Sequence, residues 1–154
     1  MVNKKFWLVI LVIILIFGMT IVSCDSSSTN VDKEQHNITI TGLSGKTGNF
    51  LILLYSYLDA SGTGVVAHAQ GTISGNSIIA SLEGIDDTPW TNNGNYYIML
   101  YIGNYETYIY TNSLTLAQLG IQSVNDLYTK IPKYNITGAA TTIAFSAFCD
   151  VTGI

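Results

Sequence analysis

The sequence predicts an all-β fold, a single antiparallel β-sandwich of about seven short strands with a short helical insertion. Apolar and polar residues alternate through several short stretches, which is the period of a strand with one buried face. The Gly-Asn dipeptides at 75–76 and 103–104 are typical of tight hairpin loops between such stretches. Frequent turn signals between short strands favour an Ig-like or jelly-roll-like sandwich.

The first expected strand begins at Asn37, with Ile38 and Ile40 on one face. Residues 50–58 are apolar on both faces, which indicates a central strand whose outer face is covered. The insertion at 113–134 is a candidate for that cover.

The next two expected strands, 65–72 and 77–83, form a hairpin around Gly75-Asn76. That loop places apolar residues opposite one another and sets His68 opposite Glu83. A Ser74-Gly75 loop keeps the same faces and sets His68 opposite Ser81.

A second hairpin joins residues 95–102 to 105–111 through Gly103-Asn104. With two loop residues its apolar face carries Ile98, Leu100, Ile102 and Ile109. The opposite face carries Tyr97, Tyr101, Tyr108 and Tyr110. Tyrosine supplies large contact area and a hydroxyl at low entropic cost, so we expect these four to form a ligand-binding surface. Aromatics are also common on sheet faces, and the insertion could cover them.

The insertion itself shows a helix start, because Ser123 and Asp126 fit a capping box and Pro132 ends the segment. The last expected strand spans residues 141–149. Cys149 shares the parity of Ile143, so we expect it to be a buried, unpaired thiol.

The N-terminus predicts export. Lys4 and Lys5 precede an apolar run at 6–23, which ends at Cys24 and is followed by a polar, serine-rich stretch. A positive start, an apolar stretch and small residues before a cleavage site define a secretory signal. An uncleaved transmembrane helix is the alternative, since the run is close to the shortest spanning length of about 17 residues.

The four residues Ile21-Val22-Ser23-Cys24 resemble the lipobox of bacterial lipoproteins. The resemblance implies a diacylglycerol on the sulfur of Cys24, acyl chains such as palmitate, and cleavage before that residue. The expected organisation is therefore a signal peptide at 1–23, lipid attachment and a flexible tether at 24–36, and a β-sandwich domain at 37–154.

The phrases at 38–43, 94–97 and 141–148 resemble small β-rich lipoproteins of spirochaetes. This resemblance implies a module of the cell envelope or surface that lipid holds to the membrane. It does not specify whether the inner membrane, the outer membrane or the surface leaflet carries the anchor.

Composition excludes several functions. The chain has no arginine, six lysines against ten acids and a net charge of −4, which makes nucleic acid an unsuitable partner. Gly45-Lys46-Thr47 lacks the rest of a phosphate-binding loop. Asp59, Asp86 and Asp87 do not have calcium-loop spacing and are interpreted as solvated loop acids. We expect neither metal nor cofactor.

The function expected from the sequence is a non-catalytic binding module for protein or glycan, anchored by lipid. The alternative is a structural envelope lipoprotein without a dedicated ligand. A hydrolase using His68, with Ser81 and Glu83 on the same sheet face, is the remote alternative. No catalytic residue is predicted, and the oligomeric state stays open.

Overall fold

The computed structural model describes residues 35–85, 88 and 90–154. The expected signal peptide, Cys24 and nearly all of the expected tether lie outside the described residues, as do Asp86 and Asp87. The description below concerns the compact unit Lys33–Ile154.

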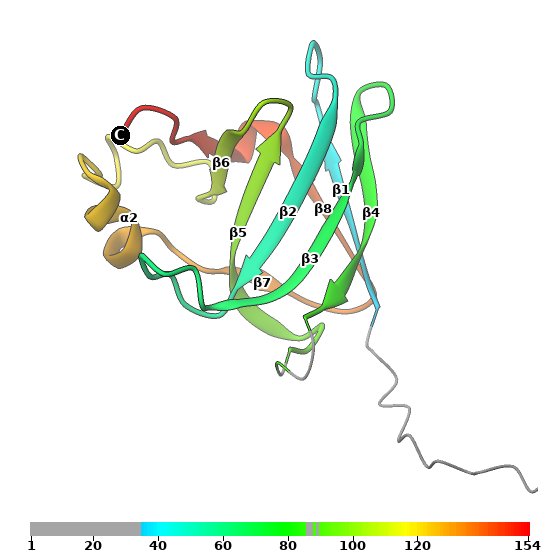
Figure 1. Cartoon of the computed structure of the whole chain (residues 1–154), viewed down its shortest axis with the longest axis horizontal. Helices are drawn as coiled ribbons and strands as arrows, with labels where there is room; N and C mark the ends of the chain where they lie inside the picture. Colours follow the sequence, from blue (N-terminus) through cyan, green and yellow to red (C-terminus); the bar gives the residue numbers. More distant parts are fainter. Residues whose placement is uncertain (1–34, 86–87, 89) are drawn as a thin grey trace, which may run out of the picture. The chain divides into compact units, whose positions relative to one another are not determined.

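Within the described residues the regular secondary structure consists almost entirely of β-strands, which confirms the predicted all-β class (Figure 1). The elements in chain order are β1 (His36–Thr41), β2 (Asn49–Tyr55), β3 (Val65–Thr72), β4 (Ser77–Gly84), β5 (Gly94–Ile102), β6 (Glu106–Tyr110), α2 (Val124–Lys130), β7 (Tyr134–Ile136), β8 (Ala140–Ala144), the 3-10 turn η1 (Phe145–Ala147) and β9 (Phe148–Asp150).

The arrangement of the strands differs from the expected sandwich. They form one sheet in the order β8-β1-β4-β3-β2-β5-β6-β9, and β7 pairs with the start of β5. The two end strands, β8 and β9, are consecutive in the chain and are separated only by η1. The sheet therefore curls into a nearly closed, barrel-like form instead of dividing into two clear layers. The expectation of a purely antiparallel sheet was also wrong, because β8 runs parallel to β1.

An aromatic cluster fills the region where the sheet nearly closes, and we call it the seam cluster. Its members come from β6, β7, η1 and β9: Tyr108, Tyr110, Tyr134, Phe145 and Phe148. The ring centroids of Tyr110 and Tyr134 are 4.1 Å apart, and those of Tyr108 and Phe145 are 4.7 Å apart, in edge-to-face geometry. Such pairs stabilise beyond the area they bury, so side-chain packing links β6, β7, η1 and β9 near the β9 end of the sheet.

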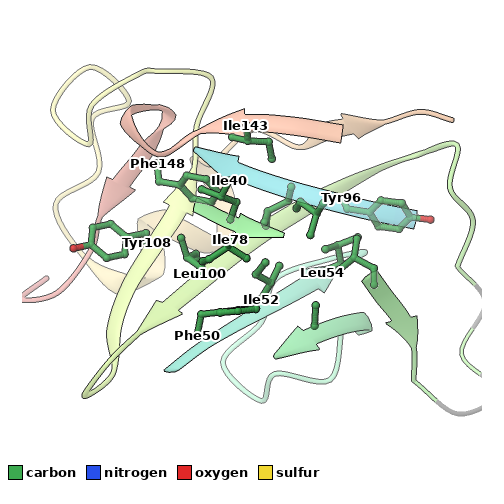
Figure 2. Packing of buried hydrophobic residues seen from close by; sticks show 14 of the residues in the cluster. Ile40, Phe50, Ile52, Leu54, Ile78, Tyr96, Leu100, Tyr108, Ile143 and Phe148 are labelled. Carbon is green, nitrogen blue, oxygen red and sulfur yellow. The ribbon is translucent and has the colours of Figure 1, made fainter. Parts of the chain in front are cut away.

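The inner face of the sheet holds the main core. Alternate residues of β1, β2, β4 and β5 point inward and are buried, among them Ile40, Ile52, Ile78 and Leu100. Figure 2 shows Tyr108 and Phe148 at one end of this core and Tyr96 at the other. Side chains thus fill the inside of the barrel-like sheet, as in other small barrels.

A second, smaller core lies on the outer face of β5 and β6. Ile109 packs there with Ile121, Leu127, Ile131 and Val151. Ser123 begins α2 as expected, and its side chain accepts a hydrogen bond from the backbone of Asp126. The insertion therefore covers part of the outer face, as the sequence suggested, although the covered strands are β5 and β6.

The structure corrects two further expectations, one at the start of β1 and one in the last expected strand. β1 begins at His36, a residue expected in the tether, and this side chain is completely buried. Its ring bonds the carbonyl of Gly138 at 2.6 Å and the hydroxyl of Thr141 at 2.7 Å, so it ties β1 to β8. The turn η1 interrupts the last expected strand and reverses its parity. Phe148 consequently points inward, and Cys149 is only half-buried on the outer side.

Candidate functional site

The β5–β6 hairpin has a three-residue loop instead of the two residues predicted. Leu100 pairs with Tyr108 and Ile102 with Glu106, so Gly103, Asn104 and Tyr105 form the turn. Tyr105 adopts a φ of 79°, a left-handed conformation that non-glycine residues seldom take. The extra residue shifts the pairing of the two strands by one position and exchanges the faces of β6.

This shift separates the four tyrosines predicted to form one surface. Tyr108 and Tyr110 belong to the seam cluster, and only 6% of the surface of Tyr108 is exposed. Tyr97 and Tyr101 remain on the outer face of β5 and are half-buried. The expected surface of four adjacent tyrosines is therefore wrong in its geometry.

Tyr97 and Tyr101 lie in a crowded environment on the outer face. Tyr97 and Met99 pack against the second core, and the ammonium of Lys133 lies 5.4 Å from the ring centre of Tyr97. Tyr55 faces Tyr97 across the strands. Burial, and next the neighbouring Tyr101, raise the pKa of Tyr55 to about 12. A partner binding here would meet a surface already in contact with the chain's own residues.

An open cleft lies at one end of the sheet, between the β1–β2 link and the β5–β6 loop. Its volume is about 320 Å³, and eight residues line it: Ser44, Gly45, Lys46, Thr47, Ile102, Gly103, Asn104 and Glu106. Figure 1 shows both loops at the same end of the strands. Small-molecule sites have volumes of roughly 300–1,000 Å³, so the cleft is at the small end of that range.

Backbone hydrogen bonds hold the two walls of this cleft. The amide of Gly103 donates to the carbonyl of Asn49 at 2.8 Å, and the amide of Ile73 donates to the carbonyl of Gly48 at 2.9 Å. A Cβ on Gly48 would lie 3.6 Å from the Cα of Gly103, so the two loops approach closely there. The cleft is thus built on strand ends that the sheet fixes.

Lys46 and Glu106 neutralise each other inside the cleft. The Lys46 ammonium donates to Glu106 Oε2 at 2.7 Å and to the Tyr108 hydroxyl at 2.6 Å. The Tyr108 hydroxyl in turn donates to the same carboxylate oxygen at 3.1 Å. These bonds raise the pKa of Lys46, with Glu106 the larger cause, and they lower the pKa of Glu106. Lys46 is therefore engaged by the chain itself, in keeping with the dismissal of a phosphate loop.

Tyr105 is a turn residue that the sequence did not predict. It stands between two lining residues, Asn104 and Glu106, and 84% of its surface is exposed. Because the two-residue loop was expected to end at Asn104, Tyr105 was placed as the first residue of a strand. The only available signal was a tyrosine directly following a Gly-Asn turn.

The three residues of the hydrolase alternative, His68, Ser81 and Glu83, are brought together only in part. His68 pairs with Glu83, as the Gly75-Asn76 register predicted. Among the described residues, however, His68 Nδ1 and the Ser81 hydroxyl are buried without a hydrogen-bond partner. No side-chain hydrogen bond within the described part of the chain connects His68 to Ser81 or Glu83, and these residues do not line the cleft.

The described ranges contain no group of three or more histidine, cysteine or acidic side chains placed to hold a metal ion. Nor does any helix in the described part of the chain have the length and apolar character needed to cross a membrane. Comparison with known proteins finds no matching family model, no similar curated protein and no similar solved structure.

Proposed function

We propose that this chain is an exported lipoprotein of a bacterial cell envelope whose β domain is a non-catalytic binding module for protein or glycan. The observation that carries the proposal is the sequence Ile21-Val22-Ser23-Cys24 at the end of an apolar run with two lysines before it. A signal of this form directs export. Lipid on Cys24 would then hold the domain at the membrane.

The physical chemistry of the anchor is consistent with this role. Each buried methylene contributes about 0.8 kcal/mol, so two or more acyl chains on one cysteine give stable attachment without a basic patch. The chain has only four lysines beyond Lys5 and an acidic balance, so it offers little electrostatic attraction to an anionic membrane. A polar stretch separates Cys24 from β1, which begins at His36, and provides a tether between lipid and domain.

Metabolic labelling with a fatty-acid analogue tests the anchor. The full-length chain should incorporate label, and Cys24→Ala should not. Cys149→Ala is the matched control, because it removes the other cysteine and should label as the wild type does. Equal labelling of wild type and Cys24→Ala would contradict the lipoprotein assignment.

A structural envelope protein without a dedicated ligand is the second candidate. The observation that favours it is the packing of Tyr108 and Tyr110 into the seam cluster, which removes them from a binding surface. The two candidates differ in whether any exposed site on the domain holds a ligand.

A further inference from the structure

We propose that the cleft between the β1–β2 link and the β5–β6 loop binds a neutral carbohydrate, with a sugar ring stacked on Tyr105. This inference rests on the proposed function, since it names the ligand class and the location for a domain proposed to bind protein or glycan. Four features of the described residues support it.

The charge of the cleft favours a neutral ligand. Lys46 and Glu106 are the two charged side chains in its lining, and their 2.7 Å ion pair leaves no net charge. An anionic ligand would have to replace Glu106 at Lys46 and would approach a chain of net charge −4. A cationic ligand would have to displace Lys46 from a carboxylate that Tyr108 also bonds.

The hydrogen-bonding groups of the cleft suit hydroxyl-rich molecules. Ser44, Thr47 and Asn104 are exposed, and none of their side chains is hydrogen-bonded to another described residue. Two hydroxyls and an amide supply both donors and acceptors, which matches the dual character of sugar hydroxyls. The two lining glycines leave their backbone accessible at short range.

Tyr105 supplies the apolar surface that carbohydrate recognition needs. Its aromatic ring is largely exposed, and the residue stands in the chain between the lining residues Asn104 and Glu106. Its φ of 79° costs conformational energy. Strained backbone is often found at binding sites, so the φ of Tyr105 supports a functional role for this residue. The negative face of an aromatic ring attracts the polarised C–H bonds of a pyranose ring, so a sugar can stack there.

The polar lining of the cleft suits a small ligand better than a protein partner. Ile102 is the large apolar residue in its lining, and it is buried. Protein interfaces usually depend on aromatic or aliphatic anchors seated in desolvated pockets. The walls, in contrast, are polar and preorganised by the backbone bonds of Gly48 and Gly103, which lowers the ordering cost for a small ligand.

The test uses the purified full-length chain in detergent micelles, titrated by calorimetry. The probes are three neutral oligosaccharides, cellotetraose, maltotetraose and tetra-N-acetylchitotetraose, together with the anionic tetragalacturonate. We expect at least one neutral probe to bind at least tenfold more tightly than the anionic probe. Tyr105→Ala should weaken that binding at least tenfold.

Tyr57→Ala is the matched control. Tyr57 is also an exposed tyrosine in a loop, but it follows the opposite end of β2, so its substitution should leave the affinity unchanged within twofold. Circular dichroism of both variants should match the wild type, because neither ring is buried.

Three results would overturn the inference: no binding of any neutral probe, binding that Tyr105→Ala leaves intact, or equal losses in the two variants. If no neutral probe binds and a protein partner is captured equally by wild type and Tyr105→Ala, the carbohydrate site is overturned and the proposed binding module still stands. Failure of fatty-acid labelling at Cys24 would instead contradict the lipoprotein assignment without bearing on the cleft.

Discussion

Replacing Phe148 by alanine should destabilise the domain strongly, because this ring is buried in the main core and belongs to the seam cluster. Phe148 is 8% exposed, and its ring centre lies 5.7 Å from that of Tyr110 and 6.3 Å from that of Phe145. Truncating a buried phenylalanine to alanine costs about 3–5 kcal/mol, which combines lost burial with the cavity left behind. Some relaxation at a sheet edge is expected, so we place the loss near 3 kcal/mol of unfolding free energy.

Urea unfolding followed by far-UV circular dichroism measures this loss. With an m-value of about 1–3 kcal/mol per molar urea, the midpoint should fall by roughly 1–3 M. Phe148→Leu keeps most of the volume and should cost less than about 1.5 kcal/mol. Ser146→Ala, at an exposed position of the same turn, should stay within about 0.5 kcal/mol of wild type. A loss below about 1 kcal/mol for Phe148→Ala, no more than an average substitution costs, would refute the packing of the seam cluster described above.

Three other perturbations probe separate parts of the domain. His36→Leu should cost about 1–3 kcal/mol in thermal unfolding, because it leaves two groups of the β8 region without their partner, whereas exposed Asn37→Ala should have little effect. The pKa of Glu106 lies below its ordinary value of 4.5, so the stability advantage of wild type over Glu106→Gln should be present above pH 4.5 and disappear as pH falls below it. Burial raises the pKa of Tyr55 from 10.0 to about 12, so the wild type should lose stability between pH 10 and 12. Its urea midpoint should fall over this range, and the midpoint of Tyr55→Phe should fall less.

Local pattern predicted the strands well where one face is clearly apolar. The alternation around Ile38 and Ile40 located β1, and apolar pairing across Gly75-Asn76 gave the observed register, with His68 opposite Glu83. In these strands a shift by one residue would expose the core residues, so alternation fixes which face is buried. It left two registers of the hairpin open, with His68 opposite Glu83 or opposite Ser81, and the structure has the first.

The same alternation did not predict the register of the β5–β6 hairpin, because its strands are apolar on both faces. Tyr108 and Ile109 are neighbours in the chain, and both are buried, one in each core. Alternation cannot choose a register when either choice buries an apolar residue. The deciding factor was the left-handed conformation of Tyr105, which tyrosine rarely adopts and which composition does not reveal.

Closure of the sheet could not be inferred from short segments either. It depends on η1 allowing β8 and β9 to lie at opposite ends of one sheet, and on rings from three distant parts of the chain meeting at the seam. His36 was missed for a related reason, since a polar residue beside a polar tether gives no sign of the partners it will find in Gly138 and Thr141.

Amide chemical-shift mapping would locate the proposed carbohydrate site residue by residue. The ¹⁵N-labelled full-length chain in micelles would be titrated with whichever of the three neutral oligosaccharides binds most tightly. Shifts should concentrate at residues 44–47 and 102–106, while those of α2 and of Tyr97 and Tyr101 stay unchanged. Shifts centred on Tyr97, Tyr101 and α2, or no shifts at all, would contradict a ligand site in the cleft between the β1–β2 link and the β5–β6 loop.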